Sequence, residues 1–114
     1  MPYLFSYGTL QQEEVQISIF ARKLVGRLDE LLGFEQSFVK IDDSTVVATS
    51  GKSHHPIVKF TGKSNDQVAG TVLEVTDAEL ANADKYEVAA YKRVTANLAS
   101  GLRAWVYVDA QCAP

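Results

Sequence analysis

Two short segments, one near each end of the chain, carry residue types that could bind and transform a small molecule. The first is Tyr7-Gly8-Thr9-Leu10, where a run typical of a strand stops at a glycine. Glycine has no Cβ, so a ligand can approach its main chain closely, and the amides that open a following helix point outward without partners. A carboxylate could accept hydrogen bonds from the amides near Gly8, Thr9 and Leu10. The alternative is an ordinary strand-to-helix turn in which Gly8 only relieves strain.

The second segment, residues 83–93, places one carboxylate where a proton could be transferred. Leu80, Ala83 and Glu87 follow one another at helical spacing, so the Glu87 side chain would project from the inward face of a helix. The negative end of the helix dipole and a dry cavity wall both disfavour the charged carboxylate, and they raise its pKa toward the range useful for a proton shuttle. The alternative places Glu87 just past the helix end, turned to solvent or paired with Arg93.

Three tyrosines form a further candidate set. Tyr7, Tyr91 and Tyr107 each fall near the end of a predicted strand. A phenol can line a pocket with its ring and still donate one hydrogen bond, so these residues could bind a substrate. The alternative for each of them is core or cross-strand packing.

Other apparent motifs do not predict a site. The letters GKS occur at 51–53 and at 62–64, but the phosphate-binding loop needs a glycine where Val46 and Ile57 stand. His54 and His55 are adjacent, with no acidic or cysteine partner at metal-ligand spacing, so we expect a solvated pair of loop residues. We therefore expect neither a metal site nor a cofactor.

The elements that must position these residues are mostly strands. The pattern predicts an irregular β-like region over 24–47, a polar loop over 49–56, and strands over 2–7, 56–62, 68–75, 91–98 and 103–109. Phe5 and Leu4 are expected on opposite faces of the first strand, and the last two strands are expected to form a hairpin around residues 99–101. It predicts helices over 11–20 and 77–86, and Thr76 with Glu79 forms the capping pattern T-x-x-E at the start of the second. About six strands and two short flanking helices give an α+β domain. With so few helices to cover it, the sheet is expected to curl into a small mixed β-barrel.

Length and composition exclude several classes of protein. The 114 residues predict a single domain over 1–114, and a net charge of −3 without a cluster of basic residues argues against nucleic acid as a partner. No apolar run approaches the roughly 18 residues of a membrane-spanning helix, so we expect no membrane association and a cytoplasmic location. Cys112 is the only cysteine, which rules out an internal disulfide. The oligomeric state is left open.

The two segments taken together resemble the gamma-glutamylcyclotransferase-like superfamily, which includes avirulence-induced-type proteins of bacteria and plants. The resemblance rests on the turn Tyr7-Gly8-Thr9-Leu10, the motif Asp84-Lys85-Tyr86-Glu87, the motif Tyr91-Lys92-Arg93, and the terminal strand Ala104-Trp105-Val106-Tyr107-Val108. It spans the whole chain in order and length, and no match is found between about residues 21 and 65. It implies a small mixed barrel with flanking helices, in agreement with the strand-rich pattern.

The resemblance also implies a reaction. Such an enzyme converts a γ-glutamyl amine or amino acid to 5-oxoproline and a free amine, by attack of the substrate's α-amine on its own γ-carbonyl. Position for position, Glu87 is implied as the catalytic acid and base and Tyr7-Gly8-Thr9-Leu10 as the substrate-binding turn, and Tyr91 and Tyr107 are expected to orient the substrate. The alternative functions are a non-catalytic module that binds a small carboxylate, and a protein-interaction module on the same fold. Residues 31–55 are expected to shape the side of the site that receives the leaving amine.

Overall fold

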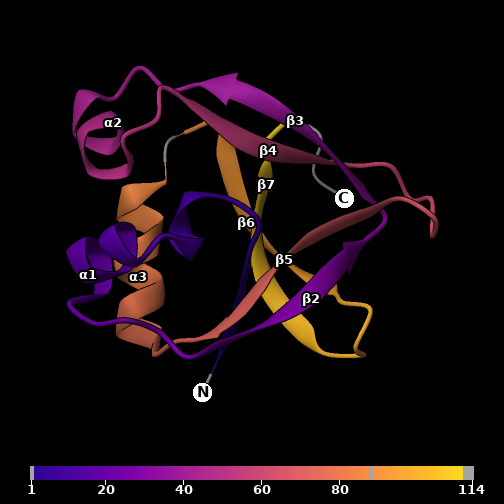
Figure 1. Ribbon diagram of the computed structural model, residues 1–114. Helices are drawn as coiled ribbons and strands as arrows, with labels where there is room; N and C mark the ends of the chain where they lie inside the picture. Colours follow the sequence, from indigo (N-terminus) through magenta and orange to yellow (C-terminus); the bar gives the residue numbers. More distant parts are fainter. Residues whose placement is uncertain (1, 88, 112–114) are drawn as a thin grey trace.

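The structure is a computed structural model that describes residues 2–87 and 89–111. Within these residues the chain forms seven strands, three α-helices and one turn of 3-10 helix (Figure 1). Their order is β1 (Tyr3–Ser6), η1 (Thr9–Gln11), α1 (Glu13–Phe20), β2 (Gly26–Leu32), β3 (Phe34–Lys40), α2 (Ser44–Ser50), β4 (His54–Phe60), β5 (Gln67–Glu74), α3 (Asp77–Tyr86), β6 (Tyr91–Asn97) and β7 (Arg103–Asp109). Cys112 lies outside the described residues.

The strands form two separate sheets. A five-stranded sheet has the order β2-β5-β1-β7-β6, in which β1 runs antiparallel to β5 and parallel to β7, and β3 pairs only with β4. The α+β class is confirmed, but the expected closed barrel is wrong. Between β2 and the β6–β7 hairpin, the described residues make a single isolated bridge, Leu31 to Leu98. The reason is that β3 leaves the sheet to pair with β4, so no strand fills the gap between the two edges.

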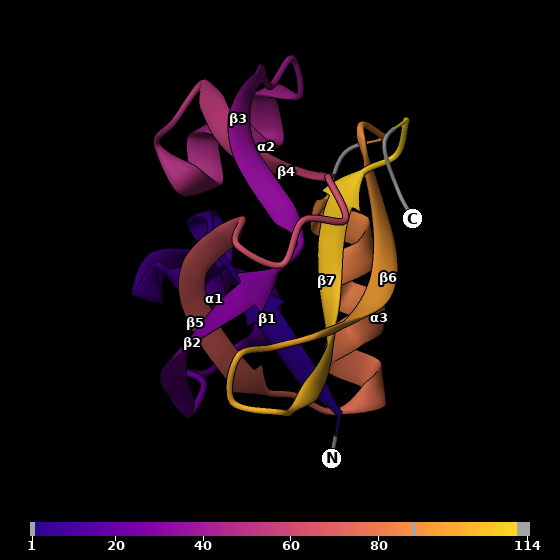
Figure 2. The same cartoon turned by 90° about the vertical axis from the view of Figure 1, so that its right-hand side faces the viewer.

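Residues 34–60, which contain β3, α2 and β4, form an arm above the five-stranded sheet. Figures 1 and 2 show this arm at one end of the molecule, and Figure 2 shows it above the end of β7. No main-chain ladder joins the arm to the five-stranded sheet in the described part of the chain. The position of the arm over the five-stranded sheet therefore depends on packing and on hydrogen bonds that involve side chains.

Helix α2 replaces part of the β-like region expected over 24–47. The β-branched residues Thr45, Val46 and Val47 favour a strand, but the helix signals on either side decide the outcome. The Asp43 carboxylate accepts hydrogen bonds from the amides of Thr45 and Val46, and Gly51 ends the helix with a φ of 74°. The expected loop over 49–56 is correspondingly shorter, because β4 begins at His54.

The remaining local expectations are confirmed with small changes of bounds. Helix α3 runs over the expected residues, and Thr76 and Glu79 form the reciprocal capping box. Strands β6 and β7 pair as a hairpin around residues 99–101. The 11–20 helix is split into η1 and α1, because the chain turns at Gln12.

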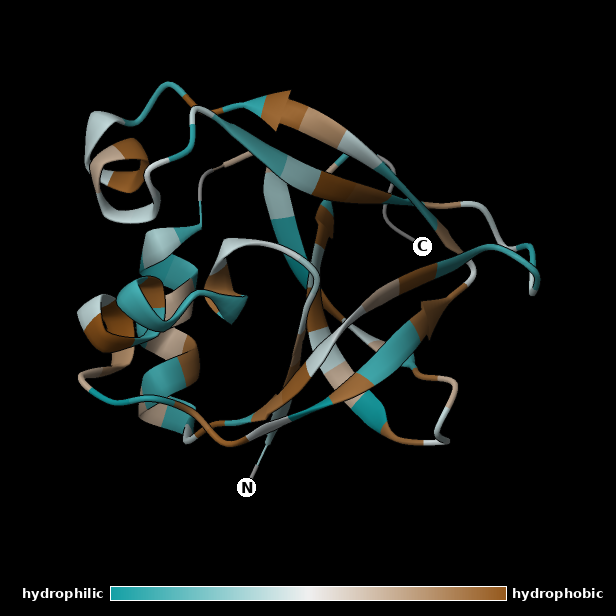
Figure 3. Ribbon diagram, in the orientation of Figure 1, coloured by the Kyte–Doolittle hydropathy of each residue, from teal (hydrophilic) through white to brown (hydrophobic). Residues whose placement is uncertain are grey.

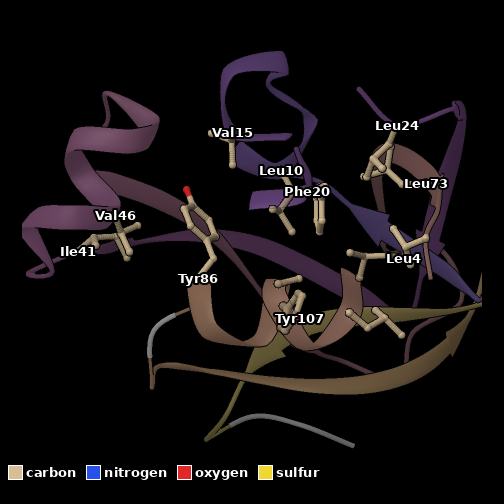
Figure 4. Close-up of a cluster of buried hydrophobic side chains, with 13 residues drawn as sticks. Leu4, Leu10, Val15, Phe20, Leu24, Ile41, Val46, Leu73, Tyr86 and Tyr107 are labelled. Atoms are coloured by element: carbon tan, nitrogen blue, oxygen red, sulfur yellow. The ribbon is translucent and has the colours of Figure 1, made fainter. Parts of the chain in front are cut away.

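Two apolar clusters fill the interior on opposite faces of β1. Phe5 belongs to the cluster between the five-stranded sheet and the arm, whereas Leu4 belongs to the cluster beneath the helices. Figure 3 shows apolar positions along the strands and on the three α-helices, and Figure 4 shows the helix-side cluster, with Tyr86 and Tyr107 among its members. Because both faces of β1 are buried, the end of this strand is held firmly at the point where the Tyr7-Gly8-Thr9-Leu10 turn begins.

No helix in the described part of the chain is long and apolar enough to cross a membrane.

Candidate active site

All seven residues that the sequence selected line one cavity. The cavity lies between the end of β1, the arm and the residues that follow α3, and its volume is about 20 Å³. Its lining residues are Phe5, Ser6, Tyr7, Gly8, Thr9, Leu10, His55, Pro56, Glu87, Tyr91 and Tyr107. A space of this size holds about one water molecule. A larger ligand therefore requires the walls to move apart.

The turn after β1 presents unpaired main-chain amides. The 3-10 helix η1 begins at Thr9, and its first hydrogen bonds run from Gln11 N to Gly8 O at 3.1 Å and from Gln12 N to Thr9 O at 2.9 Å. Among the described residues, no acceptor bonds the amides of Thr9 and Leu10. These two donors are therefore free to bind an anion, as the turn's composition predicts.

Gly8 allows the arm to approach this turn closely. A Cβ at position 8 would lie 3.0 Å from Cγ of Pro56, a distance at which one of the two residues must shift. Pro56 belongs to β4, so the glycine is the point where the arm rests on the turn. Glycine matters here because it lacks a Cβ and so lets Pro56 come close. Its φ of −130° is one that other residues also adopt.

Glu87 lies directly after α3 and lines the cavity. Its amide still bonds Ala83 O at 3.0 Å, and its own backbone leaves the helix with a ψ of 136°. The side chain accepts no hydrogen bond and makes no ion pair within the described residues. Burial, with a smaller contribution from the Asp84 carboxylate, raises the pKa of the Glu87 carboxyl from 4.5 to about 8. The carboxyl is therefore available to take and return a proton near neutral pH.

Arg93 does not neutralise Glu87, because Asp84 holds it. The Arg93 guanidinium contacts Asp84 at 2.9 Å and 3.0 Å, and it stacks 4.4 Å above the ring of Trp105. Asp84 also accepts a hydrogen bond from the Tyr107 hydroxyl at 2.7 Å. Glu87 thus lies just past the helix end, as the alternative stated, but its pairing with Arg93 is wrong. The aspartate of the D-x-Y-E motif binds the arginine and leaves the glutamate unpaired.

The three tyrosine hydroxyls all donate to protein acceptors. Tyr7 donates to Tyr107 O, Tyr91 to Pro56 O at 2.8 Å, and Tyr107 to Asp84. Burial raises the pKa of each phenol, so all three remain protonated. Because each proton is already used, these oxygens can only accept a hydrogen bond from a ligand. They suit a ligand's ammonium or amide group better than its carboxylate.

His55 and Pro56 are cavity residues that sequence reasoning missed. His55 was expected in a solvated loop pair, but it is 3% exposed and its Nε2 lies 3.0 Å from Oγ of Ser50, whereas His54 is exposed. The difference follows from alternation along a strand, which sends neighbouring side chains to opposite faces. The apolar run after Pro56 marked the strand, and extending that strand back by two residues would have indicated that one of the two histidines is buried.

The charges at the cavity exclude some chemistries. Neither lysine nor arginine lines it, so an anion there would be bound by neutral hydrogen-bond donors, among them the free amides of Thr9 and Leu10. In the described ranges 2–87 and 89–111, no group of three or more His, Cys, Asp and Glu side chains is placed to hold a metal ion. One small cavity thus holds an unpaired carboxyl and free main-chain hydrogen-bond donors. Fold and site together define an α+β domain with one unpaired carboxyl at a small cavity.

Comparison with known proteins identifies the family. The family described as "Gamma-glutamyl cyclotransferase, AIG2-like" matches residues 4–113. The chain belongs to this family. The match covers the turn after β1, Glu87 and the three tyrosines. No curated protein compared with the chain matches it.

Solved structures show the same fold. Two Arabidopsis thaliana proteins with solution structures match at TM-scores of 0.73 and 0.74 and at 24% and 23% identity. The matches cover 99% of this chain, and 64% and 71% of the two plant chains. A structure described as gamma-glutamyl cyclotransferase matches at a TM-score of 0.66 and 15% identity, over 94% of this chain and 65% of the other. The chain thus spans about two thirds of the length of these structures.

Proposed function

We propose that this protein is a γ-glutamyl cyclotransferase, which converts a γ-glutamyl amine or amino acid to 5-oxoproline and a free amine, with Glu87 as acid and base. The observation that carries the proposal is the unpaired, half-buried Glu87 carboxyl in one cavity with the free amides of Thr9 and Leu10. Family membership supports the reaction class. The leaving amine is not assigned.

The reaction needs three actions, and the site offers a group for each. The γ-glutamyl chain must be folded so that its α-nitrogen meets its γ-carbonyl carbon, the ammonium must lose a proton, and the oxyanion must be stabilised. The Glu87 carboxylate takes the ammonium proton, the nitrogen attacks, and a new C–N bond forms. The protonated Glu87 then gives its proton to the departing nitrogen as the old C–N bond breaks. The Glu87 carboxylate next takes the second proton from the new ring nitrogen and gives it to the released amine, so the products are the neutral lactam and an ammonium ion, and Glu87 is again a carboxylate. No group from outside the substrate and the protein is required for this proton balance.

The polarity of the cavity fits a γ-glutamyl group. The amides of Thr9 and Leu10 are donors, so they bind the α-carboxylate or the developing oxyanion. The oxygens of Tyr7, Tyr91 and Tyr107 can only accept, so they receive the α-ammonium protons and the amide N–H. The cavity therefore offers donors for the negative group and acceptors for the positive group of a zwitterionic substrate.

Substrate entry requires the arm to move. A cavity of about 20 Å³ holds a water molecule, and a γ-glutamyl group is several times larger. Pro56 rests on Gly8 and accepts the Tyr91 hydrogen bond, so these contacts must open for binding. Within the described residues, no ladder joins β3 or β4 to the five-stranded sheet, so a movement of the arm about its base breaks no strand pairing of that sheet.

The test is turnover of γ-glutamyl compounds by the purified protein. Wild type is incubated with γ-glutamyl amino acids and γ-glutamyl amines, and 5-oxoproline is measured. Glu87→Gln should lose at least about 10²-fold in kcat, because the general acid and base is removed. Glu35→Gln, a substitution of an exposed glutamate on β3, is the matched control and should be fully active. Full activity in Glu87→Gln would refute the role of the carboxyl.

A non-catalytic module that binds a small carboxylate is the second candidate. The small size of the cavity favours it, because a carboxylate with little else attached needs less room than a γ-glutamyl group. Binding of 5-oxoproline or glutamate without turnover of any γ-glutamyl compound would support this module over the enzyme.

A further inference from the structure

The D-x-Y-E motif contains a tyrosine to which the proposed function gives no role. Tyr86 is the last residue of α3 and stands directly before Glu87. Its ring packs in the helix-side apolar cluster (Figure 4), and the residue is 6% exposed. A phenylalanine would pack in the same way, and a buried phenol usually has a hydrogen-bond partner. The hydroxyl of Tyr86 therefore needs an explanation of its own.

The Tyr86 hydroxyl bonds the turn after β1. It lies 2.9 Å from Oγ1 of Thr9, a residue 77 positions away in the chain. Thr9 is also 6% exposed, so both partners of this bond are shielded from water. Within the described residues, it is the one hydrogen bond that joins residues 7–10 directly to α3. It connects the helix that ends beside Glu87 to a residue whose main-chain amide is free.

The remaining polar groups of the turn are held by other elements. Gly8 O and Thr9 O accept the hydrogen bonds that form η1. Leu10 O accepts a hydrogen bond at 2.9 Å from Nε2 of Gln16, which is a buried residue of α1. One buried side chain thus fixes the turn to α1, and another, Tyr86, fixes it to α3.

We propose that Tyr86 is a positioning residue, which sets the separation between the amides of Thr9 and Leu10 and the Glu87 carboxyl. Its hydrogen bond holds Thr9 to the end of α3, and Glu87 follows at that end. Cyclisation needs a constant separation, because the amides bind the carboxylate or oxyanion while the carboxyl takes a proton from the same substrate. These roles of the amides and the carboxyl rest on the proposed function. Tyr86 is not among the residues that line the cavity, so it acts through the turn.

The chain offers substitutions that remove little besides this bond. Tyr86→Phe removes only the hydroxyl, and Thr9→Val replaces the partner hydroxyl by a methyl group of similar size. Thr9→Ser keeps a hydroxyl at position 9. Tyr3→Phe makes the same chemical change at a tyrosine of β1 that does not line the cavity, so it is the matched control. Kinetic constants are measured for each variant with the γ-glutamyl compound that wild type converts best.

We expect kcat/KM to fall about tenfold in Tyr86→Phe, the effect of one buried hydrogen bond, and to be unchanged in Tyr3→Phe. Thr9→Val should lose a similar factor, Thr9→Ser should lose less, and the double variant Tyr86→Phe with Thr9→Val should be no worse than either single one. The pH at which kcat/KM levels off should not move, because burial and Asp84 raise the pKa of Glu87.

Three results would overturn the inference. They are an unchanged kcat/KM in Tyr86→Phe, losses that multiply in the double variant, and a shifted pH profile, which would mean that Tyr86 acts on the ionisation of Glu87. If Tyr86→Phe does not fold, the comparison of Thr9→Val with Thr9→Ser decides, and equal losses in these two variants overturn the inference.

A second readout separates this inference from the proposed function. NMR order parameters of the Thr9 and Leu10 amides report the rigidity of the turn without any turnover, with about 0.85 for a rigid backbone. They should be near that value in wild type and Tyr3→Phe, and should fall toward about 0.6 in Tyr86→Phe. Equal values in all three proteins overturn the positioning role. If wild type converts no γ-glutamyl compound, the cyclotransferase proposal fails, and the order parameters still decide whether Tyr86 holds the turn.

Discussion

The pH dependence of stability provides a direct test of the Glu87 environment. In the unfolded chain this carboxyl has its ordinary pKa of 4.5, and in the folded protein the pKa is raised to about 8. Between these values the folded state holds a proton that the unfolded state has released. Stability therefore falls as the pH rises through this window, because each released proton favours the unfolded chain.

The magnitude follows from the width of the window. One pKa unit corresponds to about 1.4 kcal/mol, so a window of about 3.5 units amounts to about 5 kcal/mol well above pH 8. About half of this, roughly 2 to 3 kcal/mol, falls between pH 6 and pH 9. Glu87→Gln removes the ionisation but keeps the size of the side chain. We compare the free energy of unfolding of Glu87→Gln with that of wild type at each pH. This difference should be roughly 2 to 3 kcal/mol more in favour of the variant at pH 9 than at pH 6.

Urea unfolding followed by Trp105 fluorescence measures this difference. Curves for wild type, Glu87→Gln and the exposed control Glu35→Gln are recorded at intervals from pH 5 to pH 9, and the free energies of unfolding are compared at each pH. The difference between wild type and Glu87→Gln should widen with pH, and the control should stay parallel to wild type. A difference that stays constant from pH 6 to pH 9 would refute the reasoning, because the Glu87 carboxyl would then be an ordinary solvated group.

Three further predictions concern activity and the fold. The kcat/KM of wild type should rise with pH and level off above about pH 8, because the base form of Glu87 takes the ammonium proton, and a flat profile from pH 6 to pH 9 would contradict this. Gly8→Ala should raise KM, since its Cβ would push against Pro56, while the free energy of unfolding changes by no more than about 1 kcal/mol; an unchanged KM would show that the contact is soft. Thr76→Ala removes the capping bond to Glu79 and should lower the free energy of unfolding by about 1 kcal/mol in urea titrations, with activity retained, and an unchanged unfolding midpoint would count against the cap.

The sequence predicted well where local signals and tertiary packing agree. The capping pattern at Thr76 and Glu79 fixed the start of α3, and the turn at 99–101 fixed the β6–β7 hairpin. Alternation in β1 correctly separated Phe5 from Leu4, which pack into different clusters. In each case the determining interaction lies within a few residues of the chain, or depends only on which face of a strand is apolar.

The sequence predicted the structure poorly where two local signals compete, or where contacts between distant segments determine the conformation. The β-branched run at 45–47 favours a strand, but the Asp43 cap and Gly51 made it helix α2. His55 is buried because β4 begins at His54, and the loop expected over 49–56 hid the alternation that separates the two histidines. The expected barrel failed because strand pairing beyond the hairpin is a long-range choice that periodicity does not encode.

By itself, the sequence indicated which residues could do chemistry: a turn with a glycine after the first strand, one carboxylate at the end of the 77–86 helix, and three tyrosines near strand ends. Only the tertiary structure decided that they share a cavity, that Asp84 holds Arg93 and leaves Glu87 unpaired, and that His55 of the arm joins them. The physical reason is that a carboxyl's pKa and a main-chain amide's freedom depend on which distant segments pack against them. Residue type and spacing specify the groups, and the packing of β1, α3 and the arm specifies their environment.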